Sequence, residues 1–317
     1  MEHTKHRTIR CLALLAVAGL CLPALGQDSA SVDSEQAVPQ AAQGENHLPI
    51  TLTAGGSEQF KTDINSGGEF SLARFRTGLG VPIRFDDDWA LNTAVKYELD
   101  SFSFDGSVGD PWHNINVLTA VSLLQYRLDD QWMIYGGPII RTAAESSADW
   151  GMATRAGMAA GFNYKVDEKL TVGVVVVVIG QMADHVMFAP LPTVNWQFAD
   201  DWKLVVGVSD LATGGYGAEA VWDFNQQWQF TFGGQYHKNR FRIDGSSTGN
   251  VNGIGQESAL TLTAAATWVA NQTVSVTGFV GMATGGRLRE DDNMGNDLAN
   301  THYSTAPIIG GKVDLKF

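Results

Sequence analysis

The stretch Phe85-Asp86-Asp87-Asp88-Trp89 decides the fold, because it sets a tight polar turn between two large apolar residues and recurs along the chain. Aspartate and asparagine suit such turns, since their side chains accept hydrogen bonds from nearby backbone N–H groups. Five further copies follow, of which the last is the weakest match: 128–132, 166–170, 198–202, 224–228 and 269–273. The chain is therefore predicted to reverse direction tightly at six places.

The segments that flank these turns alternate between apolar and polar residues. After the first turn, Trp89, Leu91 and Val95 fall on one face, whereas Asn92 and Lys96 fall on the other. A repeat of two residues is the period of a β-strand that has one face in each environment. The flanking segments are therefore predicted to be strands.

Longer connections, rich in Gly, Ser, Asn and Asp, alternate with the tight turns, and they span 61–69, 105–112, 143–149, 245–256 and 286–304. This alternation is typical of transmembrane barrels, which have short periplasmic turns and long extracellular loops. A first strand near 48–60 and a last strand at 305–317 bring the count to about 14 strands, an even number that leaves both termini in the periplasm. The sequence thus predicts an all-β, antiparallel, up-and-down barrel over residues 48–317.

Tryptophan gathers beside the tight turns. Membrane barrels carry aromatic belts at both interfaces, because an indole has an apolar body and a polar N–H. A soluble β-sandwich, which alternation alone leaves open, would bury tryptophan in mid-strand. Trp112 and Trp150 lie near the other ends of the strands. We interpret seven residues as the periplasmic girdle: Trp89, Trp132, Trp196, Trp202, Trp222, Trp228 and Trp268.

The first residues are predicted to be removed. A basic start is followed by an apolar run from Cys11 to Leu25, shorter than the about 20 residues that a membrane-spanning helix needs. Small residues flank Leu25, so residues 1–26 are predicted to be a signal peptide cleaved after Gly26, with an uncleaved anchor helix as the alternative. Residues 27–47 are polar and are predicted to form a flexible periplasmic segment.

Composition narrows the function further. Both cysteines, Cys11 and Cys21, lie in the leader, so the remaining chain has no thiol for a disulfide, a nucleophile or a metal ligand. The net charge of −13 argues against a nucleic-acid partner, which would need a basic surface. The sequence contains no nucleotide loop, zinc spacing or nucleophile elbow. We therefore predict no cofactor, no metal site and no enzymatic activity.

The last strand carries a recognisable pattern. Counting back in twos from Phe317, the residues Leu315, Val313 and Gly311 share its face, whereas the intervening positions are charged. This pattern resembles the C-terminal assembly signal of bacterial outer-membrane β-barrels. The resemblance implies that the barrel-assembly machinery binds this strand by strand addition during biogenesis.

The resemblance covers about residues 48–317 and is porin-like. It implies a location in the bacterial outer membrane, with membrane lipid and lipopolysaccharide as the surroundings. The pattern also looks like an uncharacterised group of such barrels, a domain of unknown function, which brings no catalytic or binding residues with it. The oligomeric state is left open.

The charged positions opposite the apolar faces are predicted to line the lumen. Arg or Lys on the lipid face would cost about 2–4 kcal/mol each at mid-membrane, so these side chains must point inward. There they either pair across the barrel and brace it, or set the field of a water-filled passage. Together with Asn92, the predicted lining residues are Arg74, Arg76, Arg84, Lys96, Glu98, Arg141, Arg155, Lys165, Glu219 and Asp223.

Two other features suggest chemistry only weakly. His237 lies near Ser246 and Ser247, which suggests a hydrolytic site, but no motif connects them and a solvated histidine is the preferred interpretation. The acidic stretch that begins at Glu290 and includes Asp297 suggests Ca²⁺, but the spacing misses the known calcium loop. A solvated acidic loop is preferred there.

Three function hypotheses follow. The first is a passive channel or transporter for small polar solutes, because about 14 strands approach the size at which side chains no longer fill the interior. The second is a closed structural or surface-interaction barrel whose long loops carry the function. The third, ranked last, is a barrel enzyme that modifies lipid.

Overall fold

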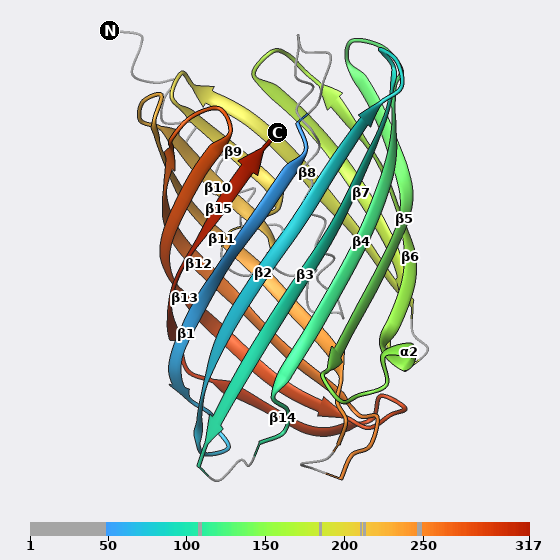
Figure 1. Ribbon diagram of the computed structural model, residues 1–317, viewed down its shortest axis with the longest axis vertical. Coiled ribbons are helices and arrows are strands. Elements are labelled where there is room, and N and C mark those ends of the chain that lie inside the picture. Colours follow the sequence, from blue (N-terminus) through green and yellow to red (C-terminus); the bar gives the residue numbers. More distant parts are fainter. Residues whose placement is uncertain (1–48, 107–109, 184–185, 210, 212–213, 246–248) are drawn as a thin grey trace, which may run out of the picture.

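The computed structural model describes residues 49–106, 110–183, 186–209, 211, 214–245 and 249–317. Within them, one antiparallel sheet closes into a barrel because the first strand pairs with the last. The tight turns and the C-terminus lie at one end, at the top of Figure 1. That end is periplasmic, since such barrels keep their short turns in the periplasm. The predicted signal peptide, 1–26, and tail, 27–47, lie outside the described residues.

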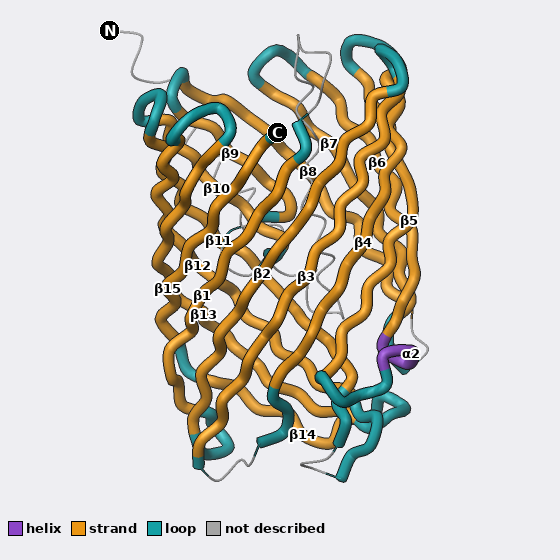
Figure 2. The backbone as a smooth tube through the Cα atoms, viewed as in Figure 1, coloured by secondary structure: helices purple, strands orange, loops and turns teal. Residues whose placement is uncertain are grey.

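Each wall strand pairs with its neighbours in sequence. The bounds are β1 Thr51–Asp63, β2 Glu69–Arg84, β3 Trp89–Asp105, β4 Asn114–Arg127, β5 Trp132–Glu145, β6 Thr154–Lys165, β7 Leu170–Gly180, β8 Val186–Ala199, β9 Trp202–Val208, β10 Tyr216–Asp223, β11 Trp228–Arg242, β12 Ile254–Val269, β13 Val274–Asp291, β14 Asp297–Tyr303 and β15 Ala306–Lys316. A short helix, α2 Trp150–Ala153, lies between β5 and β6 at the extracellular end (Figure 2). No helix within the described residues is long and apolar enough to cross a membrane.

β14 and β15 are two parts of one wall strand. Tyr303 of β14 pairs with Gly286, and Ala306 of β15 pairs with Ala283, which is the same register against β13. The backbone N–H of Ser304, between the two parts, donates to the carbonyl of Asp63 on β1. The wall therefore has fourteen strands, and the predicted all-β antiparallel barrel is confirmed.

The tight turns form as their sequence predicts. The Asp86 carboxylate accepts hydrogen bonds from the backbone N–H groups of Asp88 and Trp89, at 2.8 and 2.7 Å. Asn225 and Asn271 hold their own turns in the same way. These side chains accept hydrogen bonds from backbone N–H groups that have no strand partner in the turn. All six predicted turns join neighbouring strands at the periplasmic end.

The outer surface is an apolar band. Large side chains at alternate positions stay exposed, including Phe75 at 50%, Ile140 at 50% and Val280 at 56%. An apolar band that surrounds a closed barrel faces lipid rather than water. The wall therefore crosses a membrane, and the fold belongs to the outer-membrane type.

The extracellular half is filled by an apolar core. Phe104, Trp112 and Phe241 pack together inside it, with ring centroids 5.8 Å apart for the first pair and 5.3 Å for the last. Trp112 is only 2% exposed, so the prediction that it belongs to a second aromatic belt is wrong. Phe104 of β3 and Phe241 of β11 pack against it, and the local sequence does not reveal the contact with β11.

Two of the predicted long loops are shorter than expected. β1 ends at Asp63 and β2 begins at Glu69, so only residues 64–68 connect them. Most of 286–304 is the outer part of a β-hairpin rather than a loop, because β13 runs on to Asp291 and β14 begins at Asp297. The ends of these strands lie beyond the membrane and contain glycines and short polar residues. They therefore lack the apolar–polar alternation by which a strand is recognised in a sequence.

Candidate functional site: the lumen

The sheet that contains β11 and β12 bends across the extracellular mouth. From His237 to Arg242, and from Ile254 to Ala259, every residue is buried on both faces. In the periplasmic parts of both strands, more exposed and more buried residues alternate. Arg242 forms a bridge with Ala144 at the end of β5, although β11 and β5 are not neighbours in the wall. We call these two segments of β11 and β12 the cap.

Hydrogen bonds attach the cap to the opposite wall. The Arg141 guanidinium of β5 donates to the side-chain oxygen of Asn239 at 2.6 Å and to the carbonyl of Arg240 at 3.3 Å. The Asn239 amide donates in turn to Asp100 on β3 at 3.0 Å. The cap therefore spans the lumen and closes its extracellular end along the barrel axis.

A buried ionic cluster joins the cap to β2, β3 and β14. Arg74 of β2 contacts Glu257 of β12 at 3.0 Å and Asp100 of β3 at 3.4 Å. Glu257 also accepts hydrogen bonds from the Tyr303 hydroxyl at 2.6 Å and from Nε2 of His237 at 2.6 Å. Glu257 thus has three polar partners, Arg74, His237 and Tyr303, as a charge removed from water requires. We call these five residues the ionic cluster.

His237 differs from its prediction. It is 4% exposed and lies between Glu257 and Arg74, so the preferred interpretation as a solvated histidine is wrong. Ser246 and Ser247, its suggested partners, lie outside the described residues. Among the residues that the structure describes, no group of three or more His, Cys, Asp or Glu could hold a metal ion.

The acidic stretch of the last hairpin also differs from its prediction. Asp291 is 1% exposed and pairs with Arg240 at 2.8 Å and with Arg289 at 2.5 Å, so it is not part of a solvated loop. Asp292, at the exposed tip, accepts hydrogen bonds from the side chain and the backbone N–H of Asn296. These bonds, led by the one from the side chain, hold the pKa of Asp292 below its ordinary value.

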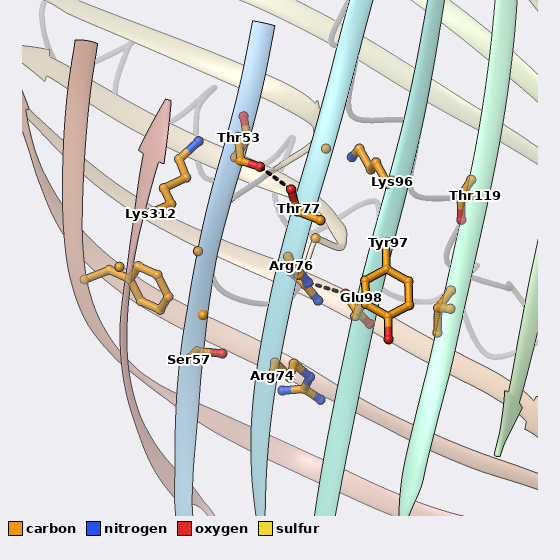
Figure 3. A pocket seen from close by; sticks show the side chains of 17 residues that line it. Thr53, Ser57, Arg74, Arg76, Thr77, Lys96, Tyr97, Glu98, Thr119 and Lys312 are labelled. Carbon is orange, nitrogen blue, oxygen red and sulfur yellow. Dashed lines mark hydrogen bonds and ion pairs between the residues drawn. The ribbon is translucent and has the colours of Figure 1, made fainter. Parts of the chain in front are cut away.

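A small cavity lies beside the ionic cluster, against β1, β2, β3 and β15. Its volume is about 50 Å³, and its lining includes Arg74, Arg76, Lys96, Glu98 and Lys312 (Figure 3). Arg76 pairs with Glu98 across adjacent strands. These side chains make the β1–β3 side of the lumen charged.

Gly214 lines the same cavity although it lies between β9 and β10, on the other side of the barrel. Leu211, three residues earlier, is buried in the apolar core. The hydroxyl of Ser209 bonds to Glu219 and accepts from the Gln235 amide. The described residues of this connection therefore lie inside the lumen.

The opposite side of the lumen is apolar. Alternate residues of β4 to β8 point inward, and they include Val121, Leu123, Ile139, Val175, Val177, Ile179, Met187, Ala189 and Leu191. We call this set the apolar wall. Barrels with water-filled channels have polar interiors, so a continuous inward apolar surface is unusual.

The other predicted lining residues lie apart from the ionic cluster. Arg84 bonds to the first tight turn through Asp87 at 2.9 Å, at the periplasmic rim. Asp223 accepts from Gln229, also near that rim. Lys165 ends β6 beside a tight turn, and Arg155 donates to a backbone carbonyl at the extracellular end.

Asn92 and the predicted girdle lie toward the periplasmic end. Asn92 is buried on the inward face of β3. Trp202 and Trp222 stack with centroids 5.6 Å apart, and Trp228 pairs with Trp268 across β11 and β12. All seven predicted girdle residues lie on strand segments next to the tight turns: Trp89, Trp132, Trp196, Trp202, Trp222, Trp228 and Trp268.

The terminal residues close the barrel. Ile50 and Phe317 exchange two backbone hydrogen bonds, of 3.1 and 2.9 Å. Val313 and Phe317 are exposed on the lipid face, at 38% and 70%. The predicted recognition of this strand by the assembly machinery stays a prediction.

Sequence reasoning missed Glu257, Asp100 and the apolar wall. A signal for the cap exists, because four of the six residues from Lys238 to Ile243 are charged or amide side chains at both strand parities, which no lipid-facing strand tolerates. The apolar wall has no such signal, since alternating Val and Ala fit either face.

Comparisons with solved structures find outer-membrane proteins at low sequence identity. An outer-membrane channel from Pseudomonas putida F1 is 14% identical, with a TM-score of 0.48 over 89% of this chain and 100% of that one. A Pseudomonas aeruginosa FadL homologue is 11% identical, with a TM-score of 0.47 over 84% and 90%. The P. putida toluene transporter TodX is 7% identical, with a TM-score of 0.41 over 86% and 90%. No family model and no curated protein sequence matches this chain.

The class of the protein follows from its own geometry. A closed fourteen-strand antiparallel wall, an apolar outer band and tight turns at one end define a bacterial outer-membrane β-barrel. Its distinguishing features within that class are the cap and a lumen with one charged side and one apolar side.

Proposed function

We propose that this barrel is an outer-membrane passage for small molecules that carry substantial apolar surface. The observation that carries the proposal is the apolar wall, which extends inside the lumen over β4 to β8. Apolar surface that meets water costs about 25 cal/mol per Å², so a wall of this kind lowers the free energy of an apolar solute beside it.

The solute class differs from the small polar solutes of the first hypothesis. The cap and the ionic cluster occupy the extracellular end, where an open pore would need a water column. Several polar atoms of the lumen, including Nη1 of Arg74 and Oε1 of Gln235, have no hydrogen-bond partner among the described residues. Buried polar atoms of this kind favour a few bound waters or the polar end of a solute. The absence of enzymatic activity stays a prediction.

Uptake tests the proposal. Gram-negative cells that produce the full chain should take up the apolar dye N-phenyl-1-naphthylamine several-fold faster than cells without it. Proteoliposomes that contain the protein should swell in a pentose at the background rate. Equal dye uptake in both cells would support a closed structural barrel, and rapid swelling in the pentose would support an open polar pore. A heat-dependent gel shift shows that the protein is folded in each case.

A further inference from the structure

The charged residues that line the cavity beside the ionic cluster are mainly cations. Among the described residues of the lining, four carry a positive charge, Arg74, Arg76, Lys96 and Lys312, and one, Glu98, carries a negative charge. They come from β2, β3 and β15, and Figure 3 shows them around one space. Charges interact more strongly inside a protein than in water, so an excess of cations around an enclosed space favours an anion in it.

Most acids that pair with these cations lie outside the lining. Arg74 pairs with Asp100 and Glu257, and Lys312 pairs with Asp314 at 3.3 Å. None of these three acids is among the described residues that line the cavity, whereas both cations are. The surface that borders the cavity is therefore more positive than the lumen around it.

Hydrogen-bond donors line the same space. Nη1 of Arg74 has no hydrogen-bond partner among the described residues, and a buried donor without an acceptor is unfavourable. Ser57 of β1 and Thr119 of β4 also line the cavity, and their hydroxyl groups can donate to an anion. Guanidinium and hydroxyl groups of this kind bind carboxylate and phosphate oxygens. The lining therefore supplies both charge and donors for an oxyanion.

The size of the cavity suits one small group. Its volume is about 50 Å³, whereas a single water needs roughly 10–15 Å³ on the same measure. A carboxylate or a phosphate ester is only a few times larger than a water, so the cavity can hold one such group. Val117 and Phe279 supply an apolar part of the lining.

The cavity adjoins the apolar wall. Lys96 of β3 and Thr119 of β4 both line the cavity and are cross-strand partners. The next inward pair toward the periplasm is Ala94 and Val121. Val121 belongs to the apolar wall, and Ala94 lies in the same buried cluster. Charged and apolar surfaces therefore meet within about 7 Å along these strands, the length of two residues.

We infer that this cavity binds an oxyanion, and that the anion is the polar end of a solute whose apolar part lies against the apolar wall. The inference rests on the proposed function and names the class of solute, which is an amphipathic organic acid. A small anion that is free in solution has the same chemistry at the cavity, but it makes no use of the apolar wall.

Two matched naphthalenes test the site without transport. 2-Naphthoate and 2-naphthalenemethanol share their rings, and only the first carries a carboxylate. Calorimetric titration of the folded protein in detergent, with partition into micelles subtracted, should give an affinity for 2-naphthoate about tenfold higher than for the alcohol. Acetate should bind far more weakly than 2-naphthoate. Equal affinities for the two naphthalenes would overturn the inference, and acetate binding as tight as that of 2-naphthoate would overturn the assignment of the anion to the solute.

Substitutions locate the site. Lys96→Gln removes a cation from the lining and should lower the affinity for 2-naphthoate several-fold, with the affinity for 2-naphthalenemethanol unchanged. Lys203→Gln is the matched control, because Lys203 of β9 pairs with Asp223 at 3.5 Å and is not among the residues that line the cavity. Lys312→Gln is a second lining variant, and each variant is first checked for the heat-dependent gel shift. An unchanged affinity in both lining variants, or an equal loss in Lys203→Gln, would overturn the site.

Dye uptake keeps the two proposals apart. N-phenyl-1-naphthylamine carries no anionic group, so its uptake tests the apolar passage alone. Uptake together with equal affinities for the two naphthalenes would overturn the oxyanion site and leave the proposed function standing. Preferential binding of 2-naphthoate without dye uptake would overturn the passage, and with it the assignment of the anion to a transported solute.

Discussion

Arg74 on β2 and Glu257 on β12 form an ion pair of 3.0 Å across the lumen, 183 residues apart in sequence and with both side chains at most 2% exposed. Neither charge is tolerated in such surroundings without the other, because each has lost its hydration. The pair therefore connects β2 in the wall to β12 within the cap and holds the cap in place. Of the two roles that the sequence allowed for the charged lumen, bracing is the one this pair performs.

Removing one partner of this pair should destabilise the barrel strongly. Glu257→Gln removes one of the two carboxylates that pair with Arg74, and breaking a buried pair in this way costs about 3–5 kcal/mol. The midpoint of thermal unfolding, followed by the loss of the heat-dependent gel shift, should fall clearly. Asp200→Asn is the matched control, because its pair with Lys169 is exposed and such pairs contribute about 0–1 kcal/mol. Equal shifts for the two variants would contradict the bracing role.

A charge on the outer face should prevent stable insertion. Val280 is 56% exposed in the middle of β13, and Arg at such a position costs about 2–4 kcal/mol in a bilayer. Val280→Arg should therefore refold into lipid vesicles with a lower denaturant midpoint than the wild type. Val280→Leu keeps the surface apolar and should match the wild type. If the arginine variant also matched it, Val280 would not face lipid.

Tryptophan fluorescence should separate the core from the rim. Trp268 is 44% exposed beside the tight turns, whereas Trp112 is 2% exposed inside the extracellular half. Brominated lipid should quench the emission lost in Trp268→Phe and spare the emission lost in Trp112→Phe. The difference spectra of the two variants against the wild type measure this directly. Strong quenching of the Trp112 component would place that residue in a lipid-facing belt instead.

The tip of the last hairpin should depend on acid pH. The pKa of Asp292 is depressed, mainly by the side-chain hydrogen bond from Asn296, so its ionised form stabilises the tip above the ordinary aspartate value of 3.8. That contribution is lost as the pH falls through the lower, folded value. Asn296→Ala should move the loss to higher pH, nearer to 3.8.

Hydrogen exchange of residues 291–297, measured by mass spectrometry from neutral pH to about pH 3 after correction for the intrinsic rate, checks this. An unchanged profile in Asn296→Ala would show that the side-chain bond does not set the Asp292 pKa. Asn300→Ala, in the middle of β14, is the comparison variant.

Local signals in the sequence were sufficient for the wall. In a tight turn such as Phe85–Trp89, one side chain accepts hydrogen bonds from the backbone N–H groups two and three residues later. Strand alternation has a period of two residues. Both patterns are therefore visible without tertiary information. They determined the fourteen strands, the end at which the turns lie and the shared outward face of residues such as Trp89 and Val95. The placement of Phe317 at the closing seam follows from the same pattern.

Only the tertiary structure decided what the lumen contains. Arg74 meets Glu257, and Asp291 meets Arg240, through closure of the barrel and bending of β11 and β12. Both depend on the whole sheet. A charged residue that must avoid lipid can face water, an ion partner or another strand, and its local sequence is the same in all three cases. The sequence by itself therefore determined a membrane barrel. The cap and the apolar wall exist because distant strands meet inside it.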